Sequence, residues 1–407
     1  MYKHPLALTT LLISLLILAI SLLTPALPRL RQLVSHIPLT TYTAPKLYST
    51  TMASSDYSKE LRIALLAVQR ATLLTKTVFH QNAKGTLDKA DASPVTIGDF
   101  GAQALINAAL QHSFPDDEIV AEEEAKDLRE NERVRNTVWE LVQAAKLSDS
   151  SAEEELGGSI KSADAMLDII DKGDSKGGSK GRIWALDPID GTKGFLRGGQ
   201  YAVALGLMVD GDVKVGVLGC PNLPVDDSEP LTEDIGADAT DAEGKGVLFS
   251  AVLGQGAASR PLAKGALAKE SKITMSTVSN ISEATFCESV EAGHSSQGDS
   301  ANIAKQLGIT KPSVRMDSQA KYGSIARGAG DLYLRLPTSK TYVEKIWDHA
   351  AGDLIVREAG GQVTDTENNR LDFSLGRTLQ ANKGVVAAPK DVHGHVIKAV
   401  MDVLGKK

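Results

Sequence analysis

The segment Asp187-Pro188-Ile189-Asp190-Gly191-Thr192 places two carboxylates three residues apart, directly after a short apolar run at residues 183–186. The apolar run predicts a buried strand. Pro188 fixes the backbone φ angle and Gly191 permits tight geometry, so we expect a stiff turn that aims both carboxylates and the carbonyl between them at one point. Such oxygens are the ligands that Mg²⁺ prefers, and Thr192 adds a hydroxyl beside them. An ordinary Asp-Pro and Asp-Gly turn is the alternative interpretation of the bare spacing.

Three further segments place carboxylates at the expected ends of strands or helices. Glu122-Glu123-Glu124 follows a predicted strand, whereas Asp99 and Asp348 each stand where a predicted helix begins. Taken singly, these segments are also typical of a solvated acidic run and of two helix caps. Taken together with Asp187 and Asp190, they suit a multi-metal site for phosphoester hydrolysis, in which metals activate water and stabilise the leaving oxygen.

The elements that must position these residues follow from hydrophobic periodicity and turn signals. Leucines at helical spacing predict a helix over residues 57–80, and a second helix is expected over 99–112. Residues 118–121 form a predicted short strand, and alternating apolar residues around Asp210-Gly211-Asp212 predict a β-hairpin. Strand and helix signals then alternate to the end of the chain, which suggests an α/β lobe.

Bulk composition narrows the class of protein. The 407 residues are enough for two ordinary domains or one large two-lobed one. A net charge of −7 argues against a general nucleic-acid surface but allows a small anionic substrate, because metals and local cations can reverse the sign in a pocket. We therefore expect a small-molecule partner, no nucleic-acid polymer, and a monomer. Cys220 and Cys287 are too few for a disulfide framework and indicate a reduced intracellular protein.

The N-terminus differs from the rest of the chain. Residues 5–28 hold no charged residue, and a stretch of this length can span a bilayer. It is interpreted as a membrane anchor, a targeting sequence or an over-extended start, because translation could begin near Met52. We expect residues 1–52 to comprise this segment and a linker, residues 53–220 a metal-binding lobe, and residues 221–407 a second lobe. The two lobes are expected in the cytoplasm, with anchoring or organelle targeting through residues 5–28 as the alternative.

The carboxylate segments resemble the lithium-sensitive, Mg²⁺-dependent phosphatase superfamily of inositol monophosphatase and fructose-1,6-bisphosphatase. The resemblance rests on Glu122-Glu123, on Asp187 to Thr192 and on residues 347–361, and it extends over residues 54–403. It implies a fold of the α/β class. The expected arrangement is a layered αβαβα sandwich, with an α+β N-terminal lobe, an α/β C-terminal lobe and the site between them.

Within the superfamily, the sequence is similar to the fungal 3′(2′),5′-bisphosphate nucleotidases. The shared strings fall at residues 93–99, 191–198, 293–296, 317–322 and 333–337. This resemblance implies removal of the 3′-phosphate from adenosine 3′,5′-bisphosphate, which gives AMP, and from 3′-phosphoadenylyl sulfate. It further implies a role in sulfate assimilation and methionine synthesis, inhibition by Li⁺ and Na⁺, and a link to salt tolerance.

The resemblance also implies a role for individual residues. The expected ligands of two or three Mg²⁺ ions are Glu122, Asp187, the carbonyl of Ile189, Asp190 and Asp348. Asp99 and Thr192 are expected to act as a catalytic pair that draws a proton from the attacking water. The expected substrate contacts are Thr192, His294, Ser318, Lys321, Arg335 and Asp348. Lys and Arg suit phosphate oxygens, and Arg can bind them through two parallel hydrogen bonds.

Two departures and two alternatives accompany this interpretation. Ala121 precedes the first glutamate where the relatives are expected to have Gly, and an acidic insertion at 222–245 has no counterpart in the pattern. An inositol polyphosphate 1-phosphatase or inositol monophosphatase would use the same metals, but the strings between residues 290 and 337 favour a nucleotide. A non-catalytic scaffold on the same fold would be expected to lack a metal carboxylate, and here all of them are present.

Overall fold

The computed structural model describes residues 56–83, 93–227, 244–291, 293, 295–339 and 341–405. Residues 55–407 form one compact unit. The segment expected at 1–52, including the apolar residues 5–28, lies outside the described residues, as do His294 and most of the insertion predicted at 222–245. No helix within the described ranges combines the length and the apolar character needed to cross a membrane.

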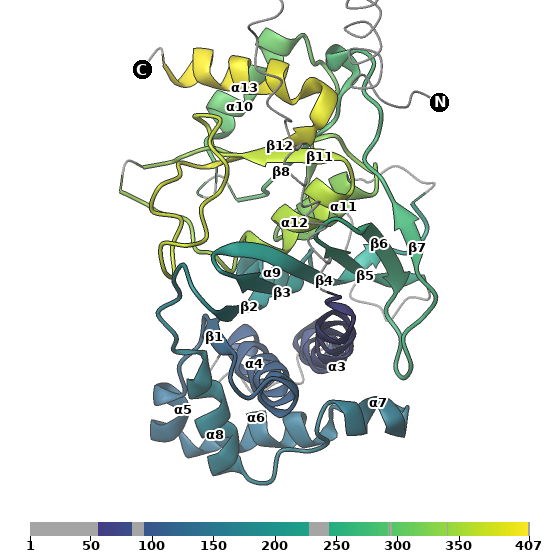
Figure 1. Ribbon diagram of the computed structural model, residues 1–407, viewed down its shortest axis with the longest axis vertical. Helices are drawn as coiled ribbons and strands as arrows, with labels where there is room; N and C mark the ends of the chain where they lie inside the picture. Colours follow the sequence, from purple (N-terminus) through teal and green to yellow (C-terminus); the bar gives the residue numbers. More distant parts are fainter. Residues whose placement is uncertain are drawn as a thin grey trace, which may run out of the picture. The chain divides into compact units, whose positions relative to one another are not determined.

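A seven-stranded sheet forms the centre of the molecule (Figure 1). Its strands lie in chain order: β1 (Glu118–Ala121), β2 (Arg182–Asp190), β3 (Ala202–Val209), β4 (Asp212–Pro224), β5 (Lys245–Val252), β6 (Gly256–Pro261) and β7 (Ser271–Ile273). β1 pairs with β2 in parallel, and all later neighbours are antiparallel. The predicted hairpin is confirmed as β3 and β4. Asp210 and Gly211 both have positive φ, as a two-residue hairpin turn of this twist requires.

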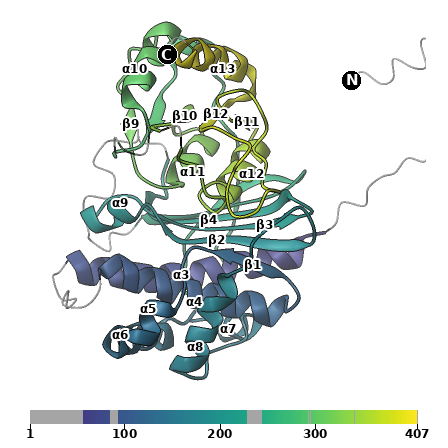
Figure 2. The same ribbon diagram turned by 90° about the vertical axis from the view of Figure 1, so that its left-hand side faces the viewer.

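Helices of the N-terminal half cover one face of this sheet (Figure 2). α3 (Ser58–Ala83) and α4 (Pro94–Ser113) lie against the sheet. Farther from the sheet lie α5 (Lys126–Glu130), α6 (Glu132–Ala144), α7 (Ser150–Glu155) and α8 (Ala163–Ile170), and the 3₁₀ turn η2 (Asp171–Gly173) follows α8. The helix expected from residue 57 is confirmed. The helix expected to begin at Asp99 begins five residues earlier, because Ser93 accepts the hydrogen bond of the Thr96 N–H and Pro94 occupies the first turn. Asp99 is therefore not a helix cap.

A five-stranded sheet lies beyond the other face, with strand order β11-β12-β10-β8-β9. These strands are β8 (Phe286–Glu288), β9 (Val314–Arg315), β10 (Leu332–Arg335), β11 (Gly361–Thr364) and β12 (Val385–Pro389); the 3₁₀ turn η3 (Ile281–Glu283) precedes β8. β8 runs parallel to both β9 and β10. Leu332 and Leu334 point to the outer core beneath α10 (Gln297–Leu307) and α13 (Lys390–Leu404), whereas Tyr333 points to the inner core with α11 (Ala320–Ala326) and α12 (Ala350–Glu358).

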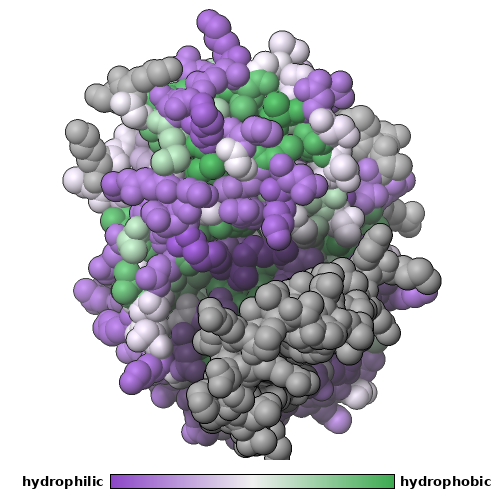
Figure 3. All heavy atoms as spheres, turned by 45° about the horizontal axis from the view of Figure 1, so that its top comes forward, coloured by the Kyte–Doolittle hydropathy of each residue, from purple (hydrophilic) through white to green (hydrophobic). Residues whose placement is uncertain are grey.

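The layers therefore run helix, sheet, helix, sheet, helix (Figures 1 and 2). The predicted α/β class is confirmed. The division expected at residue 220 remains a prediction, and that position falls inside β4, whose sheet continues to Ile273. Hydrophilic side chains cover much of the face drawn in Figure 3 and also line a recessed area near its centre.

Candidate active site

A β-bulge in β2 sets the two aspartates of the central segment on one face of the sheet. Asp187 pairs with Ala204 and Asp190 with Ala202, so three steps along β2 match two steps along β3. In a regular strand, residues three apart point to opposite faces, and one extra residue cancels that reversal. The expectation of a turn over Asp187–Thr192 is therefore wrong in its first part. The strand runs to Asp190, and only then does the chain turn into the short helix α9 (Thr192–Arg197).

Gly191 allows the segment before α11 to approach this turn closely. Its φ is 90°, and a Cβ placed on it would lie 2.8 Å from the Cβ of Ser318. Ser318 itself has a positive φ of 67°. The next residue, Gln319, donates its backbone N–H to Asp190 Oδ2 at 2.6 Å. The predicted substrate residue Ser318 is thus held against the predicted metal segment.

Two side chains outside the predicted set hold the end of β1, where Glu122 lies. Gln103 of α4 donates to the Glu123 carbonyl at 2.7 Å and accepts from the Glu123 N–H at 3.0 Å. Arg377 donates to the Ala121 carbonyl at 2.6 Å and stacks over Trp347, with its guanidinium carbon 4.9 Å from the ring centroid. These contacts fix the backbone on both sides of the Glu122 carboxylate.

The predicted carboxylates gather into one electrostatically coupled group. Burial raises the pKa of Asp187 well above its usual range, and the charges of Glu122, Asp190, Asp348 and Asp99 raise it further. Burial likewise raises the pKa of Glu122 to about 7 and that of Asp348 to about 8, with neighbouring carboxylates adding to both. Such a group is unfavourable without a cation, because like charges in a poorly solvated site repel one another.

The orphaned oxygens of this group fit a hard cation. Among the described residues, Asp187 Oδ1 and Asp99 Oδ1 are buried without a hydrogen-bond partner. Native structures seldom leave buried polar atoms unsatisfied, and a carboxylate oxygen is a preferred ligand of Mg²⁺. The donor set and the missing partners therefore both suit Mg²⁺.

Asp99 and Thr192, the predicted catalytic pair, lie in different settings. Asp99 is buried in α4, and burial raises its pKa well above the usual range, with Glu123 and Glu122 adding to the effect. Thr192 is exposed at the first position of α9. Within the part of the chain that the structure describes, no hydrogen bond joins these two residues, so their partnership remains a prediction.

The predicted cations come from the five-stranded sheet and from α11. Arg335, at the end of β10, donates to Glu344 at 2.8 Å and lies 3.8 Å from Asp348. Lys321 of α11 is buried and donates to the Met316 carbonyl at 3.2 Å. Burial lowers the pKa of Lys321 to about 8, although the charge of Asp190 opposes this change. Positive charge therefore faces the aspartates from β10 of the second sheet and from α11.

Glu344, Asp348 and His349 also bring ligand atoms within 4.8 Å of one another. All three already have partners, and Asp348 is paired with Arg335 at 3.8 Å. His349 Nδ1 lies 2.9 Å from the Tyr322 hydroxyl and its Nε2 lies 3.3 Å from Glu344, which also binds Arg335. This trio is better explained as a hydrogen-bond network that holds Arg335 beside Asp348 than as a separate metal site.

Sequence patterns missed Gln103, Gln319, Glu344 and Arg377. Glu344 lies only four residues before Asp348, so its proximity to that carboxylate could have been noticed. Arg377 contacts a carbonyl 256 residues away, and no local pattern reports such a contact.

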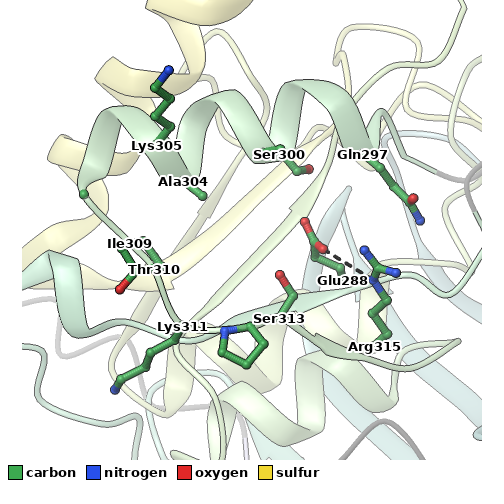
Figure 4. A pocket seen from close by; sticks show the side chains of 13 residues that line it. Glu288, Gln297, Ser300, Ala304, Lys305, Ile309, Thr310, Lys311, Ser313 and Arg315 are labelled. Carbon is green, nitrogen blue, oxygen red and sulfur yellow. Dashed lines mark ion pairs between the residues drawn. The ribbon is translucent and has the colours of Figure 1, made fainter.

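A cavity of about 420 Å³ lies away from these carboxylates, between α10 and the strands β8 and β9 (Figure 4). The Glu288–Arg315 ion pair, at 3.8 Å, stands at one end, and Lys305 and Lys311 point away from the cavity. It contains none of the predicted site residues.

Comparison with known proteins identifies the group to which this arrangement belongs. Residues 56–404 match the Inositol monophosphatase family. The chain belongs to this family. A 3′(2′),5′-bisphosphate nucleotidase of Emericella nidulans is 66% identical over 349 residues, which cover 86% of this chain and 99% of the relative. One from Schizosaccharomyces pombe is 49% identical over 86% of this chain and 97% of its own length.

Two solved structures share the fold. Mycobacterium tuberculosis SuhB is 19% identical, with a TM-score of 0.51, over 87% of this chain and all of its own. CysQ from Bacteroides thetaiotaomicron, described as a bacterial member of the family, is 18% identical, with a TM-score of 0.52, over 82% of this chain and 98% of its own. The fold inferred from the carboxylate segments is therefore confirmed.

Proposed function

We propose that this chain is a Mg²⁺-dependent phosphomonoesterase that removes the 3′-phosphate of adenosine 3′,5′-bisphosphate, giving AMP and phosphate. One observation carries the proposal: Asp187 and Asp190 share a face of β2 that meets Lys321 of α11 and Arg335 of β10. Carboxylates for metals then stand opposite cations for phosphate oxygens. The named activity of relatives that are 66% and 49% identical supports this choice of substrate.

The residues that would hold two or three Mg²⁺ ions are Glu122, Asp187, Asp190, Asp348 and, through its carbonyl, Ile189. When bound, Mg²⁺ supplies positive charge to phosphate oxygens and lowers the pKa of water. Asp99, with Thr192, takes the proton of the water whose oxygen bonds to phosphorus as the bond to the 3′-oxygen breaks, and that proton then passes to the departing 3′-oxygen, which leaves as the hydroxyl of AMP. The phosphate oxygens are bound by Ser318, Lys321 and Arg335, which orient the ester. Further contacts to the substrate come from Thr192, Asp348 and His294.

The proposal extends to 3′-phosphoadenylyl sulfate as a second substrate, and so to sulfate assimilation and methionine synthesis. It includes inhibition by Li⁺ and Na⁺, a link to salt tolerance, a monomeric state and a cytoplasmic location. The second substrate, the pathway and the inhibition rest on the resemblance to the fungal nucleotidases. The monomeric state is the default expectation, and the location rests on cysteines too few for a disulfide framework.

Phosphate release by the full-length protein with Mg²⁺ tests the proposal on three substrates. These are adenosine 3′,5′-bisphosphate, inositol 1,4-bisphosphate and inositol 1-phosphate. We expect the highest kcat/KM with the nucleotide. Equal or better turnover of an inositol compound would replace the nucleotidase with an inositol phosphatase, and no turnover of any substrate would favour a non-catalytic scaffold.

A further inference from the structure

Gln319, at the start of α11, makes three hydrogen bonds to segments that carry proposed metal ligands. Its backbone N–H donates to Asp190 Oδ2 at 2.6 Å. Its side chain is buried, donates through Nε2 to the Trp347 carbonyl at 2.9 Å and accepts the Gly352 N–H at Oε1 at 3.1 Å. One residue therefore connects the end of β2 to both sides of the segment that holds Asp348.

The contact to the Trp347 carbonyl fixes the backbone of Asp348. The carbonyl of Trp347 belongs to the peptide group that ends at the Cα atom of Asp348, and the atoms of a peptide group lie in one plane. A hydrogen bond that holds this carbonyl oxygen therefore limits where the Cα atom of Asp348 can lie. The carboxylate of Asp348 is then directed from a fixed point.

The contact to Gly352 supplies a helix cap from outside the helix. The first N–H groups of a helix have no partner within it, and a side chain at the N-cap position usually accepts from one of them. In α12 the N-cap residue is His349, which makes no such bond. Its ring contacts Tyr322 and Glu344 instead. The carboxamide of Gln319 takes over the capping role.

Close packing of α11 against α12 allows Gln319 to reach this N–H. A Cβ placed on Gly352 would lie 2.2 Å from Tyr322 Cδ2, so no larger residue fits there without a shift. Tyr322 follows Gln319 by three residues, and residues at that spacing lie on the same side of a helix. The approach at Gly352 thus brings the start of α12 within reach of the Gln319 side chain.

The two side-chain contacts require a carboxamide of this length. Nε2 must face a carbonyl oxygen while Oε1 faces an N–H, and only one orientation of the amide satisfies both. A methionine would fill the same space without either hydrogen bond. An asparagine would keep the amide but is one methylene shorter, so it would not span the two partners.

We propose that Gln319 is a positioning residue that sets the placement of Asp348 relative to Asp190. It acts through these two carboxylates and through the start of α12, without a contact of its own to metal or substrate. The inference rests on the Mg²⁺ site of the proposed function and adds the connection that holds ligands from β2 and from the start of α12 together. Mg²⁺ affinity then depends on an uncharged side chain outside the ligand set.

Calorimetric titration of the full-length protein with Mg²⁺, in the absence of substrate, tests this role. We expect Gln319→Met to raise the Kd for Mg²⁺ about tenfold, as loss of an outer-shell contact does. KM for the nucleotide at saturating Mg²⁺ should not change, because the backbone N–H of residue 319 still donates to Asp190. Gln319→Asn should show the same loss of Mg²⁺ affinity, and it carries the test if the methionine variant does not fold.

Gln69→Met is the matched control. Gln69 of α3 is buried and makes the same pair of backbone contacts, donating to the Gly265 carbonyl at 2.7 Å and accepting the Ala263 N–H at 3.2 Å. Its substitution should lower Tm to a similar extent and leave Mg²⁺ affinity unchanged. A similar loss of Mg²⁺ affinity in Gln69→Met would assign the effect to general stability and overturn the inference.

A double-mutant cycle tests whether Gln319 acts through Asp348. In an Asp348→Asn background, Gln319→Met should weaken Mg²⁺ binding no further, whereas an additive loss would contradict the proposed route. Unchanged Mg²⁺ affinity in Gln319→Met, with normal wild-type turnover of the nucleotide, would refute the positioning role and leave the proposed function standing. A wild-type protein that binds no Mg²⁺ would refute the proposed metal site, and the positioning role with it.

Discussion

The candidate site has two halves, one on the seven-stranded side and one on the five-stranded side, and they differ in how many of their polar atoms have hydrogen-bond or ion-pair partners. On the seven-stranded side, Asp187 and the nearby Asp99 keep buried oxygens without partners, and the carboxylates raise one another's pKa. On the five-stranded side, Arg335 and Lys321 already have partners, in Glu344 and the Met316 carbonyl. A bound cation would complete the first half, whereas the second is pre-formed.

This difference teaches that metal binding and substrate binding place separate demands on the fold. Stability without metal should be limited by the carboxylate half. Removal of a group from the cationic half should instead harm the fold and substrate affinity together, because its hydrogen bonds are already made.

The largest expected effect comes from Asp190→Ala, which removes a proposed metal ligand at the end of β2. We expect turnover of the nucleotide to fall by roughly 1,000-fold, comparable to loss of a major electrostatic group in an active site. Phosphate release at saturating Mg²⁺ measures this, and far-UV circular dichroism should remain native. Asp116→Ala, at an exposed aspartate in the turn before β1, is the control. Retained activity in Asp190→Ala would refute the metal assignment.

Arg335→Ala tests the pre-formed half of the site, where we expect substrate affinity and stability to fall together. Loss of a charge-assisted contact to phosphate should raise KM by roughly 10- to 100-fold. Because the nearly buried Glu344 loses its cationic partner, the free energy of unfolding should also fall by about 3 kcal/mol. Urea denaturation checks the second effect. Arg62→Ala, which breaks a more exposed ion pair with Glu155, should cost less than about 1 kcal/mol. Equal losses of unfolding free energy in the two variants would mean that burial does not strengthen the Arg335–Glu344 pair.

Arg377→Met tests whether the carboxylate half depends on backbone support. Arg377 holds the Ala121 carbonyl next to Glu122, so its loss should weaken Mg²⁺ activation by about tenfold, as outer-shell changes do. The Mg²⁺ concentration giving half-maximal rate measures this, and KM for the nucleotide at saturating Mg²⁺ should not change. Lys383→Met, at an exposed cation paired with Glu367, should leave both values unaltered. A change in KM for the nucleotide without a change in Mg²⁺ activation would mean that Arg377 supports the cationic half of the site.

The smallest effect is a pH dependence of the metal-free protein. The folded pKa values of Glu122 and Asp348, about 7 and about 8, exceed the ordinary 4.5 and 3.8. Folding therefore favours the protonated forms, so their stabilising contribution is present at low pH and is lost as pH rises through 7 to 8. In EDTA, Tm should be lower at pH 8.5 than at pH 6, and Mg²⁺ should remove the difference. Asp187→Asn, which deletes one repelling charge, should reduce this pH dependence. A Tm in EDTA that rises from pH 6 to pH 8.5 would contradict the proposed repulsion among the buried carboxylates.

Local sequence patterns were sufficient for much of the fold and for the family, and they selected carboxylates that the structure brings together. Periodicity located the helix at α3 and the hairpin of β3 and β4, and the carboxylate segments indicated the family. The start of α4 was missed although Ser93-Pro94 is a recognisable cap and first turn. The supports from Arg377 and Gln103 could not be found, because they join segments distant in the chain through tertiary packing. Likewise, proline and glycine indicated a turn at Asp187–Thr192, whereas pairing with β3 keeps the chain extended to Asp190.

The bulge in β2 makes the geometry of the candidate site depend on the count of residues as well as on their identity. Deleting Ile189 would leave the two aspartates two residues apart, and a regular ladder would still direct both to the same face of the sheet. The extra residue is therefore not needed to align the carboxylates; it adds a backbone carbonyl between them, which is a proposed metal ligand. A relative with this one-residue deletion would keep the fold and the acidic composition while lacking that carbonyl, and only the length of the interval between the two aspartates would reveal it.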